Sequence, residues 1–113
     1  MANIYKNAFF DPSDTANTVV YATDNLTRAI IQNIQVTNES GSKVVRAYVF
    51  DSSNSNTATQ IAYANISGPT ICNIAKGPII LEESDTLVLS SSDTSGISAT
   101  VSILEVNRGL IQQ

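Results

Sequence analysis

The chain contains no histidine, no tryptophan and a single cysteine, Cys72, among its 113 residues. The absence of histidine removes the commonest general base and the commonest zinc ligand, and with them Ser-His-Asp and Cys-His nucleophilic catalysis. A single cysteine forms no internal disulfide, and the apolar sequence around Cys72 predicts a small buried side chain. With five glycines, the chain also lacks the Gly-rich phosphate-binding patterns. These absences argue against an enzyme.

Charged residues are scarce as well, at 14% of the chain, and the net charge is −4. The six lysines and arginines are scattered, whereas nucleic-acid binding needs several cations on one face. No run approaches the ~18 apolar residues of a membrane-spanning helix. The N-terminus has no basic stretch followed by an apolar core, so we expect no signal peptide. We therefore predict no nucleic-acid partner, no membrane partner and no cofactor.

Neutral polar residues take the place of charge: the chain has 11 asparagines, 14 serines and 11 threonines. Their side chains compete with helix backbone hydrogen bonds and so favour sheets over helices. Turn-forming clusters separate eight β-rich runs, and we expect strands over 3–10, 17–23, 27–38, 43–51, 59–66, 70–75, 85–92 and 98–106. The segment 77–83 is either a ninth short strand or a crossing segment.

Apolar and polar residues alternate in the clearest of these runs, as in strands with one buried face. The apolar faces form the predicted core: Ile34, Val36, Val45, Ala47, Val49, Leu87, Leu89, Val101 and Ile103. Such strands, with frequent turns between them, predict an all-β fold of about eight strands. We expect an antiparallel β-sandwich, jelly-roll or immunoglobulin-like, that spans residues 1–113 as one domain with short N- and C-terminal arms.

The acidic segment "LEESDTLVL" places Glu82, Glu83 and Asp85 between two apolar runs. Calcium takes carboxylate ligands, so a calcium site is one interpretation. The other is a polar turn between two strands, in which Asp85 bonds backbone N–H groups. Close carboxylates alone do not form a glycosidase site, which needs an acid and a base across a cleft. We predict the turn, with no catalytic, cofactor-binding or metal-binding residue.

A set of mostly apolar residues lies outside the predicted core, near both ends of the chain and on the outward side of the fourth strand. An isolated monomer would leave the terminal groups partly exposed, and aromatic residues beside arginine are frequent at interface cores. We predict an interface in a homo-oligomer formed by Phe9, Phe10, Arg46, Tyr48, Phe50, Leu110 and Ile111. The alternative is that both ends fold back onto the sandwich.

The order of the segments resembles a known protein family. "IYKNAFF" is followed by "NTVVYAT", by "RAIIQNIQVTNESGSKVVRAYVFD", by "GPIILEESDTLVLSSSD" and by "SATVSILEV". This series is similar to small structural proteins of tailed bacteriophages, many of them marine or cyanobacterial phages. The family has Gly-Asp where this chain has Ser84-Asp85. We therefore expect the turn to form without a positive φ or to be of another type.

The resemblance implies a β-sandwich virion component. It points to a capsid decoration (cement) protein that stabilises the head by subunit contacts, with a neck or tail protein as the alternative. The implied partners are the major capsid protein, or neck and tail proteins, and copies of the chain itself. A trimer is implied because decoration proteins often occupy threefold positions. The implied location is the virion, assembled in the host cytoplasm. The polar loop 51–57 also leaves open a glycan-binding surface module.

Overall fold

The computed structural model describes residues 2–55 and 57–107, which form nine β-strands and a short 3-10 helix, η1 (Ser52–Asn54). The strands are β1 (Ala2–Phe10), β2 (Thr18–Ala22), β3 (Thr27–Asn38), β4 (Ser42–Asp51), β5 (Thr57–Ser67), β6 (Thr70–Asn73), β7 (Ile79–Leu81), β8 (Thr86–Ser91) and β9 (Ile97–Asn107). The predicted all-β fold is confirmed, and the undecided segment 77–83 contains the short strand β7. Among the described residues, no helix has the length and apolarity needed to cross a bilayer.

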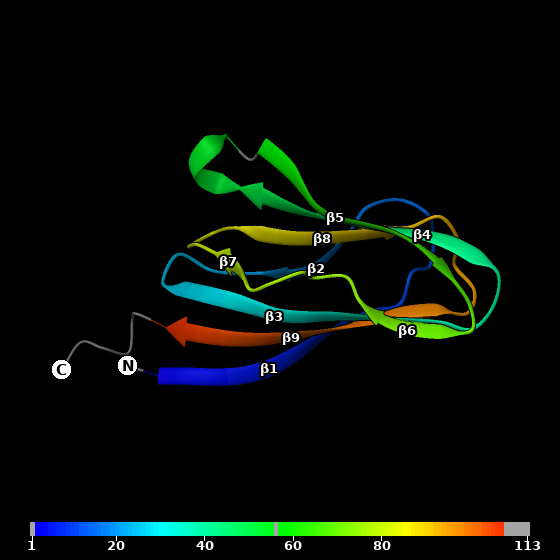
Figure 1. Cartoon of the computed structure of the whole chain (residues 1–113). Coiled ribbons are helices and arrows are strands. Elements are labelled where there is room, and N and C mark those ends of the chain that lie inside the picture. The colour runs from blue at the N-terminus through cyan, green and yellow to red at the C-terminus, as the bar shows by residue number, and fades with distance from the viewer. Residues whose placement is uncertain (1, 56, 108–113) are drawn as a thin grey trace.

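The strands form two antiparallel sheets that pack face to face (Figure 1). The first sheet has the order β1-β9-β3-β6, with β7 also paired to β3, and the second sheet has the order β2-β8-β4-β5. The pairing is nested, because β1 pairs with β9, β2 with β8, β3 with β6 and β7, and β4 with β5. The chain thus folds as one long hairpin whose successive pairs alternate between the sheets, which is a jelly roll. Of the two sandwich types left open by the sequence, the structure has this one.

The core lies between the two sheets and is close to the predicted one. Eight of the nine predicted residues are at most 1% exposed, and the ninth, Val49, packs half-buried against them. The prediction omitted Ile31, which is also fully buried. Ile31 and Ile34 face the same side because the β3–β9 register shifts between Ile31 and Asn33. A β-bulge of this kind adds one residue, so a strict two-residue period cannot reveal both.

Hydrogen bonds close one end of the sandwich. The amide of the buried Asn38 donates to the carbonyls of Gly41 and Ile66, both at 2.9 Å, and its oxygen accepts from Lys43 Nζ at 3.0 Å. Gly68 must be glycine here, since an added Cβ would lie 2.6 Å from the backbone nitrogen of Ser40. β4 runs from this end of the sandwich to the opposite end, where the carboxylate of its last residue lies in a cluster of acidic side chains.

Candidate functional site

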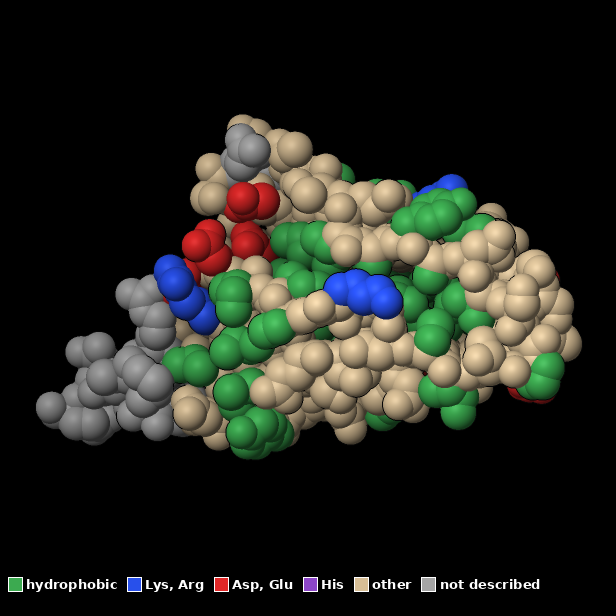
Figure 2. Space-filling model, in the orientation of Figure 1, with side chains coloured by type: hydrophobic (Ala, Val, Ile, Leu, Met, Phe, Trp, Pro, Cys, Tyr) green, Lys and Arg blue, Asp and Glu red, His purple; other side chains and the backbone are tan. Residues whose placement is uncertain are grey.

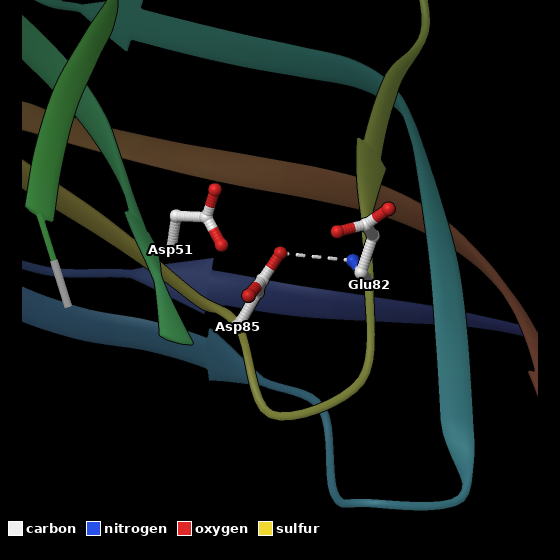
Figure 3. Close-up of side chains that lie close together, drawn as sticks. All are labelled: Asp51, Glu82 and Asp85. Atoms are coloured by element: carbon white, nitrogen blue, oxygen red, sulfur yellow. Dashed lines mark hydrogen bonds between the residues drawn. The ribbon is translucent and has the colours of Figure 1, made fainter. Parts of the chain in front are cut away.

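We call the cluster of Asp51, Glu82 and Asp85 the acidic corner. Carboxylate oxygens of the three side chains lie within 4.8 Å of one another (Figure 3). Acidic side chains gather at this end of the molecule (Figure 2), and the three residues help to line a depression of about 290 Å³. Sequence reasoning grouped Glu82 and Asp85 but missed Asp51, because only strand pairing brings the last residue of β4 beside the turn before β8. No local signal in the sequence marks this juxtaposition.

Glu83, the third member of the predicted trio, lies apart from the acidic corner. Arg28 Nε donates to both of its carboxylate oxygens, at 3.0 and 3.1 Å. Arg28 is the second residue of β3 in the first sheet, so this ion pair connects the turn to that sheet. The Arg28 side chain is half exposed, and we therefore expect this ion pair to make only a small contribution to stability.

Asp85 is buried, and each of its carboxylate oxygens has a hydrogen-bond donor. Oδ2 accepts the N–H of Glu82 at 3.0 Å, which spans the turn as the sequence predicted. Oδ1 accepts the backbone N–H of Ser52 at 3.0 Å and its hydroxyl at 3.3 Å. A carboxylate that accepts several N–H bonds is a strong structural tie. Asp85 thus joins the turn before β8 to helix η1.

The turn itself has a left-handed residue. The N–H of Asp85 donates to the carbonyl of Glu82 at 3.2 Å, and Ser84 has a φ of 66°. A positive φ at the third position is what a type II turn requires. Of the two alternatives expected from the sequence, a turn without a positive φ is therefore wrong. Thr23 at the end of β2 holds the turn, since its hydroxyl donates to Glu82 O at 2.6 Å and accepts from Asp85 N at 3.0 Å.

The hydrogen bonds of the acidic corner have a structural role. Asp51 caps η1, with its Oδ1 accepting the N–H of Ser53 at 2.9 Å and the Ser53 hydroxyl at 2.6 Å. Two of the three carboxylates therefore hold backbone groups in place. If the corner took up a cation, carboxylates of Asp51, Glu82 and Asp85 are the ligands it would offer, and they suit calcium. That it binds no metal remains a prediction.

A second polar cluster links β1 and β9 of the first sheet to β2 of the second sheet. The hydroxyl of Tyr21, on β2, donates to Glu105 Oε2 on β9, and Lys6 Nζ on β1 lies 3.5 Å from the same oxygen. Burial raises the pKa of Tyr21 well above its usual value, and the hydrogen bond to Glu105 raises it further. The cluster favours the protonated form of the Tyr21 hydroxyl and connects the second sheet to the first.

The outer face of the second sheet carries three of the predicted interface residues. Arg46, Tyr48 and Phe50 alternate along β4 on the side away from the core. Arg46 lies over the ring of its cross-strand neighbour Tyr63, at 5.1 Å from the centroid. Next to Phe50, Val19 and Val88 line a depression of about 440 Å³. This face therefore combines aromatic, aliphatic and cationic groups, as interface cores do.

The two phenylalanines at the end of β1 have different environments. Phe9 is 65% exposed, but Phe10 is 1% exposed and belongs to the core. The prediction that Phe10 lies outside the core is therefore wrong. The strand continues through residue 10, and Phe10 lies opposite Ala99 on the inward side while Phe9 points outward. The predicted interface residues Leu110 and Ile111 lie outside the described residues.

The outer face of the first sheet carries an apolar row that sequence reasoning did not assemble. Tyr5 lies opposite Leu104, Leu104 opposite Ile30, and Ile30 opposite Ile80. Residues directly opposite one another share a face, so the four side chains cross β1, β9, β3 and β7 side by side. We call them the outer stripe. Tyr5 and Ile80 at its two ends are exposed.

Comparisons with known proteins show the fold. No protein-family model matches the sequence, and no curated protein matches it. A solved chain of infectious bursal disease virus, Gx strain, superposes with a TM-score of 0.55 at 12% identity and covers 96% of this chain. This chain spans 32% of that viral chain. A chain from the pili that form Bacillus endospore appendages superposes with a TM-score of 0.50 at 9% identity, covering 91% of this chain and 85% of that one.

Proposed function

We propose that this chain is a structural protein of a tailed-bacteriophage virion, and specifically a capsid decoration (cement) protein. The observation that carries the proposal is the agreement between the phage-like segments and the jelly roll. The segments that resemble the phage family, from "IYKNAFF" to "SATVSILEV", coincide with strands of the two sheets and with the turns between them. The resemblance therefore concerns seven of the nine strands, all except β5 and β6.

The comparisons support a role in assembly. The two similar solved chains come from a virus and from pili. In the acidic corner, Asp51 and Asp85 bond backbone groups, so this cluster serves the fold. The chain has no histidine to act as a base beside it. An assembly role uses the surfaces of the sandwich, and both outer faces present apolar side chains.

The proposed mechanism is the attachment of many copies to the head surface. Arg46, Tyr48 and Phe50 on the outer face of the second sheet supply the contact with the major capsid protein. Aromatic and arginine side chains contribute most of the energy at such interfaces. The family resemblance implies that the copies form homo-oligomers, and specifically trimers. Because the copies are linked, weak individual contacts are sufficient for stable attachment.

Immunogold labelling of intact virions tests the location. We expect antibody against this chain to label the heads. Label restricted to the neck or tail would overturn the cement role and support the neck or tail alternative. If virions carry no label, the virion proposal fails, and binding on a glycan array would then support a surface module that uses the loop 51–57.

Co-sedimentation with heads that lack the chain tests the contact surface. We expect the wild-type chain to pellet with heads and to raise their thermal stability. The double variant Arg46→Glu/Tyr48→Lys should bind at least tenfold more weakly, since it places a carboxylate and an ammonium in the aromatic face. The control is Ile71→Lys, at an exposed position on the other sheet. Equal weakening by both variants would contradict the assignment of this face.

A further inference from the structure

The free edge of β1 is the most exposed part of the first sheet. β1 pairs with β9 along one side only, over all nine of its residues, and lies at the end of the sheet. Residues 3–7 are exposed in succession, on the inward as well as the outward side. Tyr5 is 74% exposed and Phe9 is 65% exposed on the outward side. The strand thus presents backbone groups at its edge together with uncovered apolar side chains.

The other four edge strands, β2, β5, β6 and β7, are less suited to pairing. β2 has five residues, and its register shifts between Val19 and Tyr21. β6 and β7 have four and three residues. β5 is long, but its register with β4 shifts between Ala47 and Tyr48, and the carbonyl of Ile66 is already bonded to Asn38. Among the described residues, β1 is the edge strand that is both long and free of a bulge. Long regular edges are templates for another strand.

We propose that β1 pairs antiparallel with β1 of a second copy, so that the first sheets of the two copies join into one continuous sheet. The occupant is a second copy because the strand is complementary to itself about a twofold axis. Centring the pair on Lys6 would align the full strands but place two lysines opposite each other, and like charges in that position are destabilising.

Centring the pair on Asn7 avoids this repulsion. Tyr5 then lies opposite Phe9 of the partner subunit, and Phe9 opposite Tyr5 of the partner subunit. Lys6 lies opposite a small residue, Ala8 of the partner subunit, and keeps its ion pair with Glu105. Aromatic pairs across neighbouring strands stabilise sheets, and both exposed aromatic residues of β1 are covered. Tyr5 is also the end of the outer stripe, so the stripes of the two copies approach each other at the axis.

This contact goes beyond the proposed function because it requires no virion partner. It is twofold, and so it differs from the threefold contact implied by the sequence resemblance. The two proposals can therefore fail independently. A chain that does not bind heads can still form the β1 pair, and a chain that does not form the β1 pair can still be tested for head binding.

Light scattering of the purified full chain, followed by substitution of the edge, tests the pair. We expect a mass of two copies for the wild type at high concentration and of one copy for Tyr5→Lys/Phe9→Lys. Ile71→Lys, an exposed isoleucine to lysine change on β6 in the same sheet, should keep the wild-type mass. A single-copy mass for the wild type would overturn the proposal. So would a mass of two or three copies that the β1 double variant leaves unchanged while its circular dichroism stays native.

Thiol cross-linking tests the register. In a Cys72→Ser background, Asn7→Cys places two thiols opposite each other across the axis, with Cβ atoms about 5 Å apart. A short bismaleimide should therefore link most of the Asn7→Cys chains into covalent dimers. The matched control is Asn3→Cys on the same face of β1, which lies opposite residue 11 of the partner and should link at least tenfold less. Equal or inverted yields would show that the strands do not pair about Asn7.

Discussion

Asp85 accepts the backbone N–H of Ser52 at 3.0 Å, although the two residues lie 33 positions apart in the chain. The bond connects the turn before β8 to the first residue of η1. The other carboxylate oxygen of Asp85 holds its own turn through the N–H of Glu82. One buried side chain thus holds two loops at the end of the sandwich opposite Asn38, and its removal should affect both.

Asp85→Asn should lower the free energy of unfolding by about 1–3 kcal/mol. The amide can accept hydrogen bonds with one atom only, so at least one N–H donor loses its acceptor and faces an NH₂ group. Urea unfolding at neutral pH measures the difference. Glu82→Gln is the control, because Glu82 is exposed in the same corner and its change should stay within about 0.5 kcal/mol. Equal effects of the two substitutions would contradict the role assigned to Asp85.

Calcium should leave the melting temperature unchanged. We expect the same thermal transition in calcium and in chelator, because Asp85 and Asp51 are bonded to backbone groups. Calcium at a free concentration 100 times its Kd would add about 2.7 kcal/mol to the free energy of unfolding. Scanning calorimetry detects such a change easily. A calcium-dependent rise that disappears in Asp51→Asn would instead establish the acidic corner as a metal site.

Ser84→Gly should stabilise the chain by up to about 1.5 kcal/mol. Serine at a φ of 66° bears a left-handed strain of about 1–2 kcal/mol, and glycine removes it at an entropic cost of about 0.5–1 kcal/mol. The measurement is the midpoint of urea unfolding. Ser67→Gly, at an exposed strand position, should be destabilising for the same entropic reason. Destabilisation at position 84 would show that the serine side chain makes a compensating contact.

Stability should fall more steeply above pH 10 in the wild type than in Tyr21→Phe. The folded state raises the pKa of Tyr21 above the value of about 10 that it has in the unfolded chain. A raised pKa means that the stabilisation is fully present below pH 10 and decreases above it, where the unfolded chain loses its proton first. Urea unfolding at pH 7 and at pH 10.5 gives the two values. If stability falls by the same amount between pH 7 and pH 10.5 in the two proteins, the raised pKa of Tyr21 and its hydrogen bond to Glu105 would be contradicted.

Leu89→Ala and Ile103→Ala should each cost about 2–5 kcal/mol, because each leaves a cavity between the sheets. Both side chains are at most 1% exposed. Ile71→Ala provides the exposed control and should have little effect. If both core variants melt like the wild type, these residues do not build the core.

The sequence by itself determined the fold class, most strand positions and most of the core. Alternation of apolar and polar residues is a local property of the strand, and Leu87 and Leu89 or Val101 and Ile103 display it directly. The polar turn at Asp85 was readable for the same reason, since an Asx side chain bonds backbone groups only a few residues away. These features depend on neighbours along the chain.

The tertiary structure decided what depends on pairing between distant strands. The nested order made the sandwich a jelly roll, and it placed Asp51 beside Asp85 and Tyr5 in line with Ile80. A bulge turned Ile31 inward, and the pairing of β1 with β9 placed Phe10 opposite Ala99 in the core. Register is fixed by long-range burial and hydrogen bonding, which a two-residue period does not encode. The same pairing left β1 at an edge, and so it determined which strand is open to a second copy.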